Sequence, residues 1–288
     1  MSGDGLTVIK GAGDLATGVA VRLYRAGLRL LMTEIAAPTA VRRTVAFAEA
    51  VYAGTTTVEG ITARYCRDLQ EAEAALAAEI IPVLVDPEAT VVRELRPTVV
   101  IDAIMAKQNL GTRLTDAPVV IGVGPGFVAG RDVHAVVETQ RGHYLGRAIY
   151  EGAAAPDTGV PGVIGGFAQE RVLRAPAAGH VEQLAAIGAQ VEAGETVALV
   201  SGQPVRAAIR GTLRGLIHAG VAVHAGMKIG DIDPRAEPAH CFTVSDKSLA
   251  VGGGALEAVL YLVRQRCPEQ LYNLFRRPPE GSARGGEP

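Results

Sequence analysis

Apolar residues in the first half of the chain fall into two patterns. Continuous apolar runs have the length and β-branched content of strands buried on both faces, and they occupy residues 28–33, 80–85, 98–104 and 119–123, with a shorter run at Val8 and Ile9. Between runs, apolar positions recur at helical spacing, as in Leu15, Val19 and Leu23. The alternation predicts an α/β class protein, with a Rossmann-like, mostly parallel sheet over residues 1–155.

Local signals add further elements to this domain. Residues 41–52 are predicted to be helical, and residues 55–65 to form a hairpin that turns at Glu59-Gly60. Asp68 is placed to cap a helix over residues 68–78, and residues 88–95 form a shorter helix. Residues 132–139 have the composition of a strand.

The chain changes character after residues 156–166, which hold two prolines and four glycines and mark a boundary. Residues 168–236 repeat themselves at an offset of 32, so that Gly179 aligns with Gly211 and Val181 with Leu213. The repeat predicts a small all-β domain with pseudo-twofold symmetry, and it resembles the biotinyl and lipoyl carrier fold, the barrel-sandwich hybrid. Carriers hold their modified lysine in the hairpin that joins the halves. Residues 201–206 contain no lysine, and Met227-Lys228 aligns away from that hairpin, so no covalent biotin or lipoate is expected.

The remaining segments and the composition narrow the class of protein. Residues 237–265 form a C-terminal segment whose apolar helix, 249–263, is introduced by three glycines at 252–254 and packs back, and residues 278–288 are expected to be disordered. A formal charge of −2 without a basic cluster argues against nucleic acid or an anionic membrane as partner. Three widely spaced cysteines, with no signal peptide or long apolar run, indicate a cytoplasmic protein.

The first glycine loop carries the main candidate chemistry. Gly11 serves a tight turn, Gly13 permits close approach of a phosphate to the backbone, and Ala16 allows the helix to pack on the strand, with Asp14 between them. Glu34 ends the next strand 21 positions after Gly13, where an acid grips a ribose in NAD-type sites. These residues predict a nucleotide or cofactor site, and the alternative is a βα turn without a ligand.

A second glycine loop lies at the same predicted sheet edge. It contains Gly122, Gly124 and Gly126, and it lines a common pocket with the first loop if the two face each other; otherwise both are structural turns. Lys107 belongs to this edge and is either a contact for an anionic ligand or a solvated loop lysine.

His134, Glu138 and His143 form a third candidate group, because they bring imidazoles and a carboxylate together in one short segment. General acid–base chemistry, metal binding and a structural hydrogen-bond network all remain open for them, and sequence spacing alone does not show the convergence that a metal site needs. We therefore assign no metal ligands and leave catalysis undetermined.

Several of these motifs together resemble one family. They are residues 11–18, Thr33-Glu34, 42–47, 122–127, 129–134, 141–143, 228–235 and 245–247, and they are similar to the accessory protein of the selenium-dependent molybdenum hydroxylase system. The resemblance implies a maturation factor that binds molybdenum cofactor, its dinucleotide form or another nucleotide, and that acts on a molybdenum hydroxylase client. Transfer of selenium or sulfur by this chain is in doubt, because it lacks clustered cysteines.

Two other functions fit the same residues. One is an NAD(P)-dependent oxidoreductase, for which Glu34 favours NAD over NADP. The other is a scaffold without enzymatic activity, whose glycine loop is structural. Across these functions, the expected ligand is a small nucleotide or pterin and the expected protein partner is the client hydroxylase. The sequence leaves open whether the chain forms a homo-oligomer.

Overall fold

A large mostly parallel sheet forms the centre of the α/β domain, as predicted. The computed structural model describes residues 3–275, which leaves the predicted disordered tail, 278–288, outside the described residues. The strand order is β10-β9-β7-β6-β1-β2-β5-β4-β3. Neighbours are parallel except at the two edges, where β10 and β3 run antiparallel to β9 and β4. The elements of this domain are β1 (Leu6–Lys10), α1 (Asp14–Arg25), β2 (Arg29–Glu34), α2 (Ala50–Ala53), β3 (Thr55–Val58), β4 (Ile61–Cys66), α3 (Leu69–Ala77), β5 (Ile81–Val85), α4 (Val91–Leu95), β6 (Val99–Asp102), β7 (Val119–Val123), β8 (Val128–Ala129), β9 (Ala135–Val137), β10 (Ala148–Ile149) and β11 (Gly152–Ala153).

Helices cover both faces of this sheet. On one face, apolar residues of α1 and of the C-terminal helix α5 (Asp246–Arg266) pack in one buried cluster with side chains of β1, β2, β6 and β7. On the other face, α3 and α4 contribute to a second cluster. The strand order reverses beside β1, between β6 and β2, and an open α/β sheet binds ligands at the carboxyl ends of strands at such a point.

Two local predictions for this domain fared differently. The hairpin is confirmed, because β3 and β4 pair antiparallel around Glu59 and Gly60, which both have positive φ. The helix over residues 41–52 is wrong: two 3-10 turns, Arg43–Val45 and Phe47–Glu49, precede the short α2. Ala46 between them is extended, and the Phe47 amide donates to Thr17 Oγ1 at 2.8 Å, so a contact with α1 replaces the helical bond.

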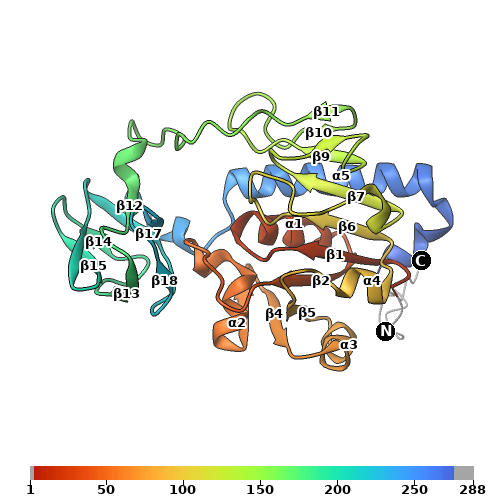
Figure 1. Ribbon diagram of the computed structural model, residues 1–288, viewed down its shortest axis with the longest axis horizontal. Helices are drawn as coiled ribbons and strands as arrows, with labels where there is room; N and C mark the ends of the chain where they lie inside the picture. Colours follow the sequence, from red (N-terminus) through yellow and green to blue (C-terminus); the bar gives the residue numbers. More distant parts are fainter. Residues whose placement is uncertain (1–2, 276–288) are drawn as a thin grey trace, which may run out of the picture.

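The second domain consists of two four-stranded sheets around one apolar core, with strand orders β12-β19-β17-β14 and β16-β15-β13-β18. Figure 1 shows it at the left, beyond the linker that leaves β11. Its strands are β12 (Val172–Arg174), β13 (Gly179–Gln183), β14 (Gln190–Val191), β15 (Thr196–Val200), β16 (Gln203–Arg206), β17 (Gly211–Leu216), β18 (Ala222–Val223) and β19 (Lys228–Asp233).

The pairing of these strands follows the sequence repeat. Val181 of β13 pairs with Val200 of β15, and their equivalents 32 residues later, Leu213 and Ile232, pair in the same way. The short strand of each repeat pairs with a strand of the other repeat: β18 of the second repeat pairs with β13 of the first, and β14 of the first pairs with β17 of the second. The two halves therefore enclose one core that neither half could form alone.

Helix α5 returns the chain to the α/β domain. It begins three residues before the predicted helix, where Ser245 caps it by accepting a hydrogen bond from the Ser248 amide at 3.2 Å. The glycines at 252–254 do not introduce this helix but lie within it. Gly252 lies against the backbone of Gly18 on α1, so the two helices cross at the distance that only glycine permits. Between residues 3 and 275, no helix is long and apolar enough to cross a membrane.

Candidate functional site

The turn between β1 and α1 presents unused backbone amides. Gly11 turns the chain with φ +89°, and Gly13 is an extended N-cap residue with no side-chain cap. Within the described residues, the amides of Gly13, Asp14, Leu15 and Ala16 have no hydrogen-bond acceptor, because the first helical bond runs from Thr17 to Gly13. A helix start of this kind attracts an anion through its free N–H groups and its dipole.

Space for a ligand adjoins these amides. A cavity of about 520 Å³ is lined by Gly11, Gly13, Asp14, Ala16 and Glu34, together with the segment that follows β6. A Cβ atom added at Gly13 would meet nothing within 4 Å. The structure therefore brings together all five residues predicted for the first glycine loop, at the sheet edge where the strand order reverses.

The carboxylate of Glu34 is already hydrogen-bonded to the protein and is not left free to bind a ribose. Its two carboxylate oxygens accept hydrogen bonds from the Ala12 amide at 2.9 Å and from the Ile35 amide at 2.8 Å. Burial raises the pKa of this carboxyl above its usual value, and the two amides oppose that effect. Glu34 thus stabilises the glycine loop itself, while still lining the cavity.

Two further cavities continue from the first, and together the three form one cleft between the domains. They measure about 580 and 260 Å³, and Lys228 lines all three. Asp14 and Arg42 line both the 520 Å³ cavity and the 260 Å³ cavity. Arg141 and Lys247 line both the 580 Å³ cavity and the 260 Å³ cavity. One wall therefore belongs to the α/β domain and the opposite wall to the β domain.

The second glycine loop is shaped by packing against its own neighbours. The Phe127 side chain covers Gly122, Gly126 with φ +110° lies against the Gln108 backbone, and the Gly124 amide donates to the Val137 carbonyl at 2.8 Å. Pro125 of this loop lines the 580 Å³ cavity, whereas the three glycines do not. Their predicted ligand role stays a prediction, and the contacts agree with structural turns.

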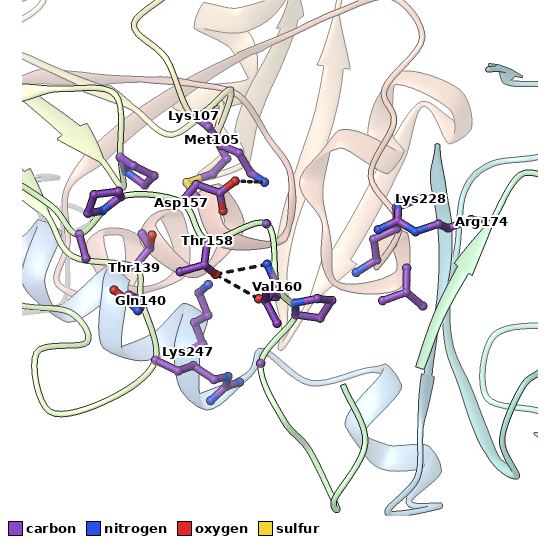
Figure 2. Close-up of a pocket in the computed structure, with 18 residues that line it drawn as sticks. Met105, Lys107, Thr139, Gln140, Asp157, Thr158, Val160, Arg174, Lys228 and Lys247 are labelled. Carbon is purple, nitrogen blue, oxygen red and sulfur yellow. Dashed lines mark hydrogen bonds and ion pairs between the residues drawn. The ribbon is translucent and has the colours of Figure 1, made fainter. Parts of the chain in front are cut away.

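Lys107 lies at the rim of the same cavity. Its Nζ atom is 2.7 Å from the Asp157 carboxylate, and Figure 2 shows the pair at one side of the pocket. The charge of this lysine is therefore already balanced before any ligand binds.

His134, Glu138 and His143 do not converge. His134 accepts a hydrogen bond from the Val120 amide through Nδ1 at 2.9 Å, and burial lowers its pKa to about 4. Glu138 accepts from the amides of Thr139, Gln140 and Ala155, which fixes the loops around the 580 Å³ cavity, and His143 is exposed with its ring edge-on to Tyr144. The part of the chain that the structure describes contains no group of three histidine, cysteine or acidic side chains that could hold a metal.

Sequence reasoning missed the cationic side chains of the cleft. Lys247 follows the cap of α5, and its side-chain ammonium makes no hydrogen bond or ion pair with any residue between 3 and 275. Figure 2 shows it rising from α5 toward the pocket centre, opposite Lys228 and Arg174 of the β domain. Burial lowers the pKa of Lys247, and the Asp14 carboxylate partly offsets this. Ser245 is a residue type that favours a helix N-cap, and this signal could have placed Lys247 at a helix start, whereas the predicted helix began at residue 249.

The comparisons with known proteins give no activity for this chain. No family model matches it. A curated relative, "Uncharacterized protein YqeB" of Escherichia coli (strain K12), is 52% identical over 264 residues, which cover 92% of this chain and 49% of the relative. The chain thus spans about half the length of the curated relative it matches.

Solved structures show only faint likeness. An aspartoacylase family protein from Mesorhizobium loti has a TM-score of 0.25 at 11% identity, with 80% of this chain and 85% of that one covered. The ectoine utilization protein EutE (DoeB) from Ruegeria pomeroyi has a TM-score of 0.24 at 13% identity with the same coverage. These scores are too low to assign a fold family or an activity.

The expected membership of the molybdenum hydroxylase accessory family is wrong. Neither the curated relative nor the solved structures are described by molybdenum, selenium or a hydroxylase, and no family model supports such a role. Several residues that carried the resemblance have structural partners instead. Arg42 binds Asp14 and the carbonyls of His240 and Thr243, and Arg141 binds Asp246. These two arginines therefore hold separate segments of the chain together.

Proposed function

We propose that the chain binds a phosphate-bearing small molecule of the nucleotide class at the start of α1. The supporting observation is the set of unused amides from Gly13 to Ala16, which open into the 520 Å³ cavity. A phosphate group there would replace water on several backbone donors at once, and cavities of this size hold small-molecule ligands.

Asp14 does not oppose this proposal, although it places a negative charge in the first turn. Its carboxylate is 3.4 Å from the guanidinium of Arg42, whose side chain is 10% exposed. This ion pair compensates the acidic charge and leaves the helix dipole and the nearby cations to attract an anion.

An NAD-dependent oxidoreductase is the second candidate, because Glu34 ends β2 beside the cavity. Both of its oxygens already accept backbone hydrogen bonds, so the structure favours a phosphate site over a specific ribose grip. We further propose that the β domain is a barrel-sandwich hybrid that supplies the second wall of the cleft and carries no swinging arm.

Substitution of Gly13 by alanine tests the proposal. Gly13 is extended, and its added methyl group would enter open space, so we expect the Gly13→Ala protein to keep its melting temperature. The methyl group would hold a phosphate away from the amides, and we expect at least about tenfold weaker binding of AMP, ATP or NAD, since one lost charge-assisted hydrogen bond has this effect. Binding is measured by calorimetry and by ligand-induced shifts in melting temperature.

Gly253→Ala is the matched control, because its methyl group also meets nothing within 4 Å but lies in α5 away from the cavity lining. It should bind like the native protein. The proposal is refuted if AMP, ATP, NAD and NADP all fail to bind, or if Gly13→Ala binds them as well as the control does. Tight binding of NAD without AMP or ATP would favour the oxidoreductase.

A further inference from the structure

The smallest of the three cavities, about 260 Å³, contains the densest positive charge of the cleft. Two acidic side chains line it, Asp14 and Asp231, and two more, Asp233 and Asp246, form ion pairs with cations of the lining. The cations outnumber all four acids. They are Arg42, Arg141, Arg171, Arg214, Lys228 and Lys247.

Arg214 shows most clearly that the positive charge of this cavity lacks hydrogen-bond acceptors within the described residues. Its side chain is 7% exposed, and its nearest anionic partner is Asp233 at 3.6 Å. Within residues 3–275, none of its guanidinium donors makes a hydrogen bond, and its Nε atom is fully enclosed. Buried guanidinium groups are normally satisfied, because leaving a buried donor unpaired is costly.

The neighbours of Arg214 relieve this cost only in part. Burial lowers the pKa of Arg214, and the like charge of Arg42 lowers it further. The carboxylates of Asp233 and Asp231 raise this pKa against the effects that lower it. Lys247 faces the same cavity without a partner of its own, and the Nε atom of Arg171 is also buried and unpaired. An anion placed among these groups would supply the acceptors and the charge that the protein itself lacks.

The cationic cavity is connected to the nucleotide site. Asp14, Leu15, Arg42 and Lys228 line both the 520 Å³ cavity and the 260 Å³ cavity. A chain of phosphates that begins at the α1 amides therefore reaches the arginines without leaving the cleft. We propose, building on the function proposed above, that the ligand is a polyphosphate compound, a nucleoside di- or triphosphate, whose terminal phosphates occupy the cavity around Arg214 and Lys247.

This arrangement also makes ligand binding a contact between domains. Arg171, Arg214 and Lys228 belong to the β domain, whereas Arg42 and Lys247 belong to the α/β domain and α5. Figure 2 shows Lys228 on one side of the cleft and Lys247 on the other. Terminal phosphates would lie between the domains and hold them together, and a monophosphate at α1 would not.

Calorimetry with AMP, ADP, ATP and inorganic tripolyphosphate in EDTA buffer tests the inference. We expect ATP to bind at least about tenfold more tightly than AMP, and tripolyphosphate to compete with ATP, because added phosphates gain charge-assisted hydrogen bonds. Lys247→Gln should weaken ATP binding about tenfold and change AMP binding less than about twofold. Loss of the ammonium group should not unfold the protein, because within the described residues this group makes no hydrogen bond or ion pair and interacts with Asp14 only at longer range.

Arg93→Gln removes one exposed charge on α4, far from the cleft lining, and should change neither affinity. Lys228→Gln provides a second test: this lysine is exposed at the start of β19 and lines all three cavities, so its loss should weaken ATP binding, and an unchanged ATP affinity would contradict the inference. Equal affinities for AMP and ATP would overturn the inference while leaving the nucleotide site intact. An equal loss for both ligands in Lys247→Gln would overturn it as well, because Lys247 does not line the 520 Å³ cavity. Failure of every nucleotide to bind would instead refute the function on which the inference rests.

Discussion

Helices α1 and α5 cross so that both begin at the cleft. Substituting the adjacent glycines Gly252 and Gly253 of α5 measures how much this crossing depends on close approach of the two backbones. A Cβ atom at Gly252 would lie 2.9 Å from the Gly18 carbonyl carbon and 2.8 Å from Arg22 Cγ, whereas a Cβ atom at Gly253 would meet nothing within 4 Å. Ordinary contact begins at 3.4 Å, so the Gly252→Ala protein must separate the helices by at least about 0.5 Å.

The pair of variants isolates the packing cost. Each alanine gains about 1 kcal/mol of helix propensity over glycine, and this gain is common to both positions. Overpacking costs about 1–3 kcal/mol and applies only to Gly252→Ala. We therefore expect the free energy of unfolding of Gly253→Ala to be up to about 1 kcal/mol higher than that of the native protein. It should be about 1–3 kcal/mol higher than that of Gly252→Ala. At roughly 3 °C per kcal/mol for a chain of this size, the two melting temperatures should differ by about 3–9 °C.

Urea denaturation followed by circular dichroism measures the difference as a shift in midpoint with an unchanged slope. Gly252→Ala should also bind nucleotides more weakly than Gly253→Ala, because displacement of α1 moves its free amides relative to Lys247. Equal midpoints for the two variants would refute the idea that the helix contact is tight enough to exclude a methyl group.

Two further predictions concern buried polar groups. The pKa of His134 is lowered to about 4 while an unfolded histidine titrates near 6.5, so the unfolded chain takes up a proton first and stability should fall as pH decreases from about 6.5 to 4. Urea midpoints at pH 7 and 5 should show a smaller decrease for His134→Gln than for the native protein, and an equal decrease would rule out this histidine as the cause. Arg171→Met leaves the Asp231 carboxylate, 2.9 Å away in the native protein, buried without its main partner and should cost about 3 kcal/mol. The double variant Arg171→Met/Asp231→Leu should recover most of that loss, and a double variant no more stable than the single one would contradict the assignment.

The elements that sequence predicted well are those fixed by periodic apolar positions. The runs at 80–85, 98–104 and 119–123 became the interior strands β5, β6 and β7 of the sheet, because strands buried on both faces must be apolar throughout. The hairpin followed from the turn chemistry of Glu59-Gly60. The segment after β2 was predicted wrongly, since its apolar positions serve contacts with α1 and the β domain rather than one helical face.

The site was only half visible in the sequence for a similar reason. The glycine loop is a local signal, and the structure places its residues around one cavity. The cations that surround the adjoining cavity are residues 42, 141, 171, 214, 228 and 247, which span 205 positions, so no local spacing indicates that they meet at one site. Glu34 shows that a local signal can also mislead. Its spacing from Gly13 suggested that it binds a ribose, whereas its oxygens accept hydrogen bonds from the protein's own amides.

The internal repeat of the β domain offers an independent reason to associate these cations with function. Positions that fill the core keep their apolar character in both copies, as in Val197 and Ile229. The charged residues at the cleft do not: Arg214 and Asp231 occupy positions where the first copy has Glu182 and Leu199. A repeat that needs only to fold would tolerate the same residues in both halves. The buried charges Arg214 and Asp231 instead occur in the copy whose strands β17 and β19 contribute residues to the cleft with α1 and α5, and Arg214 is buried there without hydrogen bonds. Since burying such a group opposes folding, its presence in one copy alone supports the proposal that an anion binds between the domains.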